Sequence, residues 1–183
     1  LIIGAGSSGL TLGIALLNIG KSVMVVDKVE IHQSVPQAIV VEKSTLQALE
    51  HYGISNKLID QGDPLDGITF NIAGDTVLSF PFDLAGDYEL SRQHPFILRL
   101  RDTEECLVQR FTQLGGQLIK GASFEPEVNH ISKYAPNEPM DIVLNYDGVR
   151  FPVRCGWLFG CDGLHSAVRN ALMIEFSGTT EQE

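Results

Sequence analysis

A glycine-rich turn near the start of the chain constrains the fold more than any other feature. Gly4-Ala5-Gly6-Ser7-Ser8-Gly9 has the pattern G-x-G-x-x-G and lies between a short apolar strand, 1–3, and an apolar helix, 8–19. In such a unit the first glycine permits a tight turn, the second lets a pyrophosphate approach, and the third lets helix and strand pack closely. Amides at the helix start then face the phosphates. The pattern predicts a dinucleotide site built on Gly4, Gly6, Ser7, Ser8 and Gly9.

The next stretch supports this prediction. A valine-rich strand is expected at 22–26, which completes a βαβ unit, and Asp27 follows it, eighteen residues after Gly9. In dinucleotide-binding folds an acidic side chain at this place accepts hydrogen bonds from ribose hydroxyls. A glycine-rich turn that serves packing only is the alternative at this point.

Composition and charge exclude other classes of protein. The chain has 183 residues, of which 44% are hydrophobic, so it can bury a sizeable core and is not a disordered polyelectrolyte. It carries 13 basic and 23 acidic side chains, a formal net charge of −10, which makes nucleic acid and anionic membranes poor partners. The segment 1–20 has no charged side chain, but its five glycines argue against a membrane span.

The cysteines and histidines indicate no metal site. Cys106, Cys155 and Cys161 form no C-x-x-C pair and the five histidines are scattered, so we expect neither a disulfide framework nor a bound metal. A reducing, cytoplasmic location fits this cysteine usage. No Ser-His-Asp or paired-carboxylate arrangement is recognisable, and we assign no catalytic residue.

Beyond the βαβ unit the pattern mixes helices with antiparallel strands. Helices are expected at 42–51 and 166–172, and Asp102 with Glu105 reads as a capping box that opens a third helix reaching residue 114. Strands are expected at 66–72, 76–80, 96–100, 117–119, 124–131, 140–146, 149–153 and 157–159, with Asp147-Gly148 as a hairpin turn. The chain is therefore predicted to be α/β with antiparallel additions.

A second motif narrows the choice of dinucleotide. Asp162-Gly163 follows an apolar strand and precedes a short helix that carries Ser166 and Arg169. This order, D-G-x-x-S-x-x-R, combined with the first motif, resembles the class A flavoprotein monooxygenases, the group of para-hydroxybenzoate hydroxylase and phenol hydroxylase. The resemblance implies a Rossmann-like FAD-binding domain of the glutathione reductase type, with an antiparallel β-meander and part of a β-sheet substrate domain.

The resemblance extends over nearly the whole chain. A helix motif of the family, R-A followed by T-L-x-x-L-x-x-x-G, is matched by Ala38, Thr45, Leu46, Leu49 and Gly53. Gln37 stands where the family usually has an arginine near the flavin, so it can hydrogen bond to the cofactor but supplies no positive charge.

Further cofactor-binding residues follow from the resemblance. Lys28 would border the adenosine, the backbone of Phe124 would meet the adenine, and Asp162 with Gly163 would approach a ribose or ribityl hydroxyl. Relatives place a Gln or Arg at the end of the strand before the long helix. Arg101 is the candidate for that role and Arg99 the reserve, while Arg169 could be structural.

The implied activity is that of an oxidoreductase. It would hold FAD, take hydride from NADH or NADPH, and use O2 to hydroxylate an aromatic, phenolic small molecule. The alternatives are another FAD enzyme of the same scaffold, namely a halogenase, an epoxidase or a prenyl-lipid reductase, or a non-catalytic FAD-binding module.

The implied domains are discontinuous. Residues 1–63 and 99–183 would bind FAD, and 64–98 would be the first piece of the substrate domain, with the aromatic residues Phe70, Phe80, Phe82, Tyr88 and Phe96. The rest of that domain would lie beyond residue 183. We therefore expect an amino-terminal portion of a longer protein, which by itself binds FAD weakly and does not hydroxylate. A homodimer is compatible with the sequence.

Overall fold

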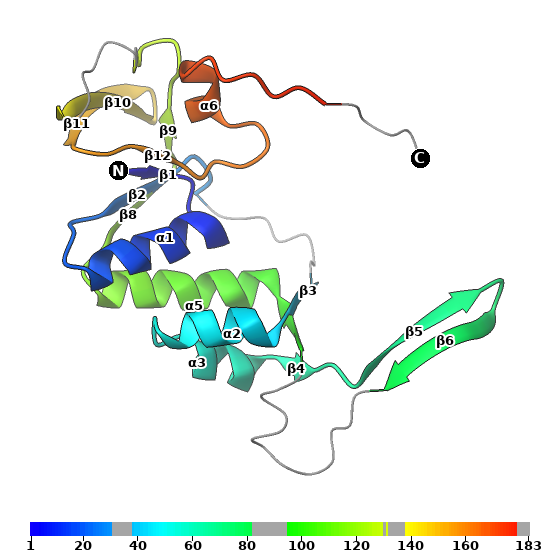
Figure 1. Ribbon diagram of the computed structural model, residues 1–183. Helices are drawn as coiled ribbons and strands as arrows, with labels where there is room; N and C mark the ends of the chain where they lie inside the picture. The colour runs from blue at the N-terminus through cyan, green and yellow to red at the C-terminus, as the bar shows by residue number, and fades with distance from the viewer. Residues whose placement is uncertain (31–37, 82–94, 130, 132–137, 179–183) are drawn as a thin grey trace. The chain divides into compact units, whose positions relative to one another are not determined.

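The computed structural model describes residues 1–30, 38–81, 95–129, 131 and 138–178. The chain divides into two compact units, and Figure 1 shows the elements of both. The first unit combines Leu1–Gln33 with Phe111–Glu183, and the second is Ser34–Arg110. The first unit is therefore built from two segments that are distant in the sequence. The mixture of a parallel sheet with antiparallel strands, described below, confirms the predicted α/β fold.

A four-stranded parallel sheet forms the centre of the first unit. Its strands are β1 (Ile2–Ile3), β2 (Met24–Asp27), β8 (Gln117–Lys120) and β12 (Phe159–Gly160), in the order β12-β1-β2-β8. Ile3 lies opposite both Val26 and Gly160, so the carboxyl ends of β1, β2 and β12 meet at one edge of the sheet. Ligands bind at this edge in folds of this kind.

Helix α1 (Ser7–Asn18) connects β1 to β2 and covers one face of the sheet (Figure 1). Its buried residues, Gly9, Leu10, Gly13 and Ile14, recur at the spacing of one helix face. A Cβ at Gly13 would lie 2.7 Å from the ring of Phe111 and 3.4 Å from the side chain of Val25. The absence of a side chain at Gly13 thus lets α1 approach the sheet closely.

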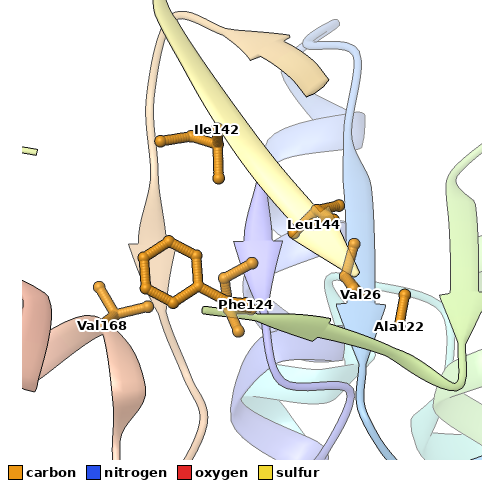
Figure 2. Close-up of a cluster of buried hydrophobic side chains, with 7 residues drawn as sticks. Val26, Ala122, Phe124, Ile142, Leu144 and Val168 are labelled. Carbon is orange, nitrogen blue, oxygen red and sulfur yellow. The ribbon is translucent and has the colours of Figure 1, made fainter. Parts of the chain in front are cut away.

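An antiparallel sheet covers the other face. Its strands are β9 (Ala122–Phe124), β10 (Met140–Tyr146) and β11 (Val149–Cys155), and the predicted Asp147-Gly148 turn joins the last two, with φ angles of 51° and 79°. Figure 2 shows the core between the two sheets, to which α6 (Ala167–Ala171) adds Val168. Its buried side chains are Ile3, Val26, Ala122, Phe124, Ile142, Leu144 and Val168.

The second unit contains helices, a small sheet and a hairpin. The helices among its described residues are α2 (Lys43–Glu50), α3 (Ser55–Gln61) and most of α5 (Leu100–Gln113). Its antiparallel sheet has the order β3-β7-β4, with β3 at Ala38–Val41, β7 at Phe96–Arg99 and β4 at Asp63–Pro64. Strands β5 (Gly67–Ile72) and β6 (Asp75–Pro81) form the hairpin.

The hairpin has one polar face and one apolar face. Thr69 lies opposite Ser79, whereas Ile68 lies opposite Phe80 and Phe70 opposite Leu78. The rings of Phe70 and Phe80 meet edge to face, with centroids 6.5 Å apart. These four apolar side chains are 42% to 53% exposed, so the described part of the chain leaves their face largely uncovered.

Several local predictions are wrong. The strand predicted at 124–131 ends at Phe124, and a turn at 126–128 follows it. The long helix begins at Leu100 rather than at Asp102, because Asp102 and Glu105 bind Arg99 and Arg101 instead of capping a helix start. Elements α3, β3 and β4 were not predicted at all. Among the described residues, no helix has both the length and the apolar character that crossing a membrane requires.

Candidate functional site

A cavity of about 280 Å³ lies at the carboxyl edge of the parallel sheet. Three segments that are distant in the sequence line it: the glycine turn after β1, the end of β2, and the loop after β12, joined by β9. Its volume is near the lower end for ligand pockets, about 300 Å³. Seven of the predicted site residues meet there: Gly4, Gly6, Asp27, Lys28, Phe124, Asp162 and Gly163.

The glycine turn has the shape that its sequence predicts. Gly4 has a φ of +105°, and a Cβ there would lie 2.2 Å from the carbonyl oxygen of Cys161. A Cβ at Gly9 would lie 1.9 Å from the carbonyl oxygen of Gly4. A Cβ at Gly6, in contrast, would meet nothing within 4 Å. Gly4 and Gly9 therefore serve close packing, whereas Gly6 leaves open space that a ligand can approach.

The start of α1 is suited to bind an anion. Gly6 occupies the N-cap position and has no side chain with which to accept a hydrogen bond, and the first turn contains no acidic residue. The first amides of a helix have no partner within the helix, and they carry a partial positive charge. Ser7 is half-buried and Ser8 is exposed at this helix end. Neither serine lines the cavity, nor does Gly9, whereas Gly6 just before them does.

Asp27 ends β2 and is buried, with 8% exposure. Its Oδ2 accepts a hydrogen bond from the amide of Ala5 at 2.7 Å, and its Oδ1 accepts one from the amide of Val29 at 2.8 Å. The carboxylate thus joins the glycine turn to the end of β2 at the wall of the cavity. The sequence predicts the acid but not these two partners.

Asp162 organises the start of α6. Its Oδ1 accepts a hydrogen bond from the Ser166 hydroxyl at 2.6 Å, and its Oδ2 accepts from the amides of Ala167 and Val168 at 2.6 and 3.2 Å. Ser166 is the N-cap residue and accepts from the amide of Arg169 at 3.0 Å. The D-G-x-x-S-x-x-R motif is thus a helix start in which the acid and the hydroxyl both accept backbone amides.

Arg169 also holds the loop that precedes α6. Its guanidinium donates to the carbonyl of Leu164 at 2.8 Å and lies over the ring of Phe176, 4.5 Å from the centroid. These contacts support a structural role for Arg169. Gly163 has a φ of +78° and no neighbour within 4 Å of a Cβ, so the loop turns sharply beside open space.

The titrating groups of the cavity differ in their exposure. Burial raises the pKa of the Cys161 thiol, and the neighbouring carboxylate of Asp162 raises it further. This thiol is therefore protonated at neutral pH and is a poor nucleophile. Lys28 and His165 are exposed at the cavity wall. No group of three or more His, Cys, Asp or Glu side chains among the described residues is arranged to hold a metal ion.

Phe124 lines the cavity, whereas neither Arg101 nor Arg99 does. The Phe124 side chain is 6% exposed and belongs to the core, which leaves its backbone as the part that a ligand could reach. Arg101 is the second residue of α5, not the end of a strand, and its Nε donates to Glu105 at 2.9 Å, while Arg99 ends β7. Both arginines belong to the second unit. Gln37 lies outside the described residues.

Sequence reasoning missed some cavity residues. Val29 supplies an amide to Asp27, and Cys161 and His165 line the cavity from the loop after β12. Cys161 and His165 adjoin positions that the D-G motif had already singled out. The Val29 amide follows from the tendency of an Asp side chain to bind the backbone two residues on, which is a signal the sequence does contain.

Comparison with known proteins shows to which family the chain belongs. A family model described as an FAD binding domain matches residues 1–183. The chain is 30% identical over 185 residues to 6-methylpretetramide 4-monooxygenase of Streptomyces rimosus, covering 100% of this chain and 31% of that protein. It is 27% identical over 188 residues to pentachlorophenol 4-monooxygenase of Sphingobium chlorophenolicum, covering 100% of this chain and 33% of that protein. The chain thus spans about a third of the length of these relatives.

Solved structures share the fold. The crystal structure of the flavin-dependent monooxygenase PieE, in complex with FAD and substrate, superposes with a TM-score of 0.79 at 22% sequence identity. The match covers 97% of this chain and 32% of that one.

Proposed function

Because the chain belongs to the FAD binding domain family, we propose that the protein carrying it is an FAD-dependent monooxygenase. Two relatives are monooxygenases named for 6-methylpretetramide and pentachlorophenol. We accordingly propose an aromatic, phenolic small molecule and O2 as substrates, with NADH or NADPH as reductant. Bound FAD would supply the redox chemistry, and the residues of this chain would bind and orient it.

The cavity at the carboxyl edge of the sheet carries this proposal. It gathers the glycine turn, Asp27 and Asp162 from three separate parts of the sequence. The open side of Gly6 and the first amides of α1, with Ser7 and Ser8, fit the diphosphate. These features fit the adenosine diphosphate part of FAD, and a volume of about 280 Å³ suits a part of the cofactor rather than its whole length.

The neighbouring residues would complete the site. Asp27 and Lys28 would lie at the adenosine, and the Phe124 backbone at the adenine. Asp162 and Gly163 would lie toward the ribityl chain. Arg101 and Gln37 would contact the flavin side of the cofactor, a role that the family resemblance alone supports.

We further propose the domain division 1–63 and 99–183 for the cofactor and 64–98 for the first piece of the substrate domain. The apolar face of the β5–β6 hairpin, which the described residues leave largely uncovered, supports this division. An exposed apolar face of this kind normally packs against another part of the folded protein. A homodimer and a cytoplasmic location remain part of the proposal.

The activity is tested on the full-length protein. It should purify with flavin absorbance, and phenols should stimulate its oxidation of NADH or NADPH with formation of a hydroxylated product. A full-length protein without flavin and without such oxidation would refute the proposal.

Gly6→Ala tests the phosphate site. The new methyl group meets no protein atom within 4 Å but occupies the space proposed for the phosphates. We expect FAD to bind about tenfold to a hundredfold more weakly, the range that an overpacked contact costs, with only a modest loss of stability because alanine is a poor N-cap. Flavin fluorescence titration and thermal unfolding measure the two effects.

Gly156→Ala is the matched control. A Cβ at Gly156 also meets nothing within 4 Å, and Gly156 does not line this cavity. Its FAD affinity should equal that of the wild type. A folded Gly6→Ala variant that retains wild-type affinity would show that the phosphates bind elsewhere.

A further inference from the structure

A second, larger cavity lies at the opposite edge of the parallel sheet, where the amino ends of its strands meet. Ile2, Met24, Gln117 and Phe159, the first residues of the four strands, all line it. Its volume of about 890 Å³ is within the range of ligand pockets, about 300–1,000 Å³. All of its lining residues belong to the first unit, and none of them lines the cavity proposed for FAD.

The wall of this amino-edge cavity is largely apolar and includes an exposed aromatic side chain. Trp157, the only tryptophan of the chain, is 68% exposed. Its ring lies nearly parallel to that of Phe159, with 18° between the planes and 6.5 Å between the centroids. Leu16 from α1 and Val153 from β11 add aliphatic surface. An indole exposed in an apolar concavity favours a ligand with an apolar body.

The charged side chains that line the amino-edge cavity are all positive. Lys21 and Arg154 are both exposed there, and no acid is among the described lining residues. Asp141, opposite Arg154 in the ladder of β10 and β11, does not line the cavity. Burial raises the pKa of the Cys155 thiol, so this lining group is neutral at pH 7. In a chain with a net charge of −10, two cations without a lining acid favour an anionic group at this place.

Helix α1 ends beside the amino-edge cavity, and free carbonyls at a helix end would repel an anion. The amides of Gly20 and Lys21 bind the carbonyls of Leu17 and Leu16 at 2.9 and 3.0 Å. These carbonyls therefore have partners within the protein, and their repulsion of an anion is reduced.

We propose that the amino-edge cavity is a second binding site, which takes an amphipathic organic anion. The apolar body of the ligand would pack on Trp157 and Phe159, and its carboxylate would lie at Lys21 and Arg154. Because both cations are exposed, each adds at most about fivefold to the affinity, and the apolar contact supplies most of the rest. The proposal goes beyond the FAD function and does not depend on it.

Fluorine NMR of the full-length protein labelled with fluorotryptophan tests the site. The resonance of Trp157 is identified by its absence in Trp157→Phe. The probes are octanoate, octanol and octylammonium, which share an apolar chain and differ in the charge of the head group. We expect octanoate to shift the Trp157 resonance saturably and to bind about tenfold more tightly than octylammonium.

A double variant tests the two cations. Lys21→Gln with Arg154→Gln should weaken octanoate about tenfold and change octanol less than about twofold, which also shows that the site is still folded. Lys43→Gln with Lys120→Gln is the matched control, because it removes two charges from exposed lysines outside the cavity lining. Its octanoate affinity should stay within about twofold of the wild type, since distant surface charges are screened by salt.

Three results would overturn the proposal. A Trp157 resonance that octanoate does not shift would mean that another part of the protein, or a second copy, covers the cavity. Equal octanoate affinity in the two double variants, or no preference for octanoate over octylammonium, would exclude an anion site. The comparison of head groups needs no variant, so it decides the question even if the double variant does not fold. A change in flavin absorbance with the same dependence on octanoate would assign the binding to the cofactor side instead.

Discussion

At the scale of single residues, the Asn129 side chain makes hydrogen bonds to β10 that the backbone of a neighbouring strand would otherwise make. It is 4% exposed, and its side chain exchanges hydrogen bonds with both backbone groups of Val143, at 2.8 Å each. It also donates to the carbonyl of Glu125 at 2.9 Å. The side chain therefore pairs with β10 where the predicted continuation of β9 would have paired, which is why the strand predicted at 124–131 is not needed beyond Phe124.

Asn129→Ala should consequently destabilise the first unit by about 3 kcal/mol, because it leaves the two polar groups of Val143 and the Glu125 carbonyl without their side-chain partner. Urea unfolding measures the change. Asn170→Ala, at an exposed position of α6, is the control and should lie within about 0.5 kcal/mol of the wild type. A difference of less than about 1 kcal/mol between the two variants would contradict this account.

At the scale of elements, four helices end in the same way. The backbone hydrogen bonds after α1, α2, α5 and α6 include one that spans five residues back, to Leu16, Leu49, Phe111 and Arg169 respectively. This is the Schellman motif, whose C′ residue has a positive φ. Glycine takes that position in the first three helices, at Gly20, Gly53 and Gly115, but α6 has Met173 with a φ of 54°.

Met173→Gly should therefore stabilise the protein by about 0.5–1 kcal/mol, since it relieves the left-handed conformation of a residue with a Cβ. Met173 is 81% exposed, so the substitution removes little packing. Thermal and urea unfolding report the gain. The neighbouring Ile174, whose φ is not positive, provides the contrast: Ile174→Gly should lower stability, and a gain there as well would refute the argument.

The antiparallel sheet of β9, β10 and β11 is stabilised at one end by the carboxylate of Glu125. The side chain of Asn145 donates to Glu125, and Arg150 donates to the same carboxylate at 2.8 Å. These hydrogen bonds, the one from Asn145 first, hold the pKa of Glu125 below its usual value of 4.5. A lowered pKa means that the folded state favours the charged form.

The stability that Glu125 contributes should therefore be complete above about pH 4.5 and be lost as the pH falls through the lowered pKa. Glu125→Gln should be less stable than the wild type at pH 7, and the difference should shrink toward pH 3. Urea midpoints of both proteins across this range check the sign. A difference that grows on acidification would contradict the assignment.

At the scale of the whole molecule, the sequence predicted those parts that short-range chemistry determines. The glycine turn, Asp27 at the end of β2 and the Asp147-Gly148 hairpin turn were all recognisable, because each needs particular residue types at fixed spacing. What the motifs could not reveal was the long-range partner of Asp27, the amide of Ala5, which the folded shape supplies. The Val29 amide and the helix start at Asp162 lie close to their acids in the sequence, so local tendencies of aspartate account for them.

The errors arose where other contacts, some local and some tertiary, prevail over the pattern from which an element was predicted. Asp102 and Glu105 have the spacing of a capping box, yet the arginines at 99 and 101 compete for them, and the helix starts earlier. Helix α3 is short, and its Leu58 shares a buried face with Ile54, a pair that is uninformative without the surrounding helices. The pairing of β4 with β7 could not be predicted from the sequence either, because a strand of two residues is too short to show a periodic pattern.

The position of β12 beside β1 has a consequence for biosynthesis. Ile2 pairs with Phe159, so β1 is translated some 157 residues before this partner strand. At about 5–20 residues per second, that delay is on the order of ten to thirty seconds. The nascent chain can assemble β1, α1 and β2 early. The loop after β12, which lines the cavity at the carboxyl edge of the sheet, is translated after the other segments that line it. Loading of a nucleotide must follow, rather than guide, the first steps of folding.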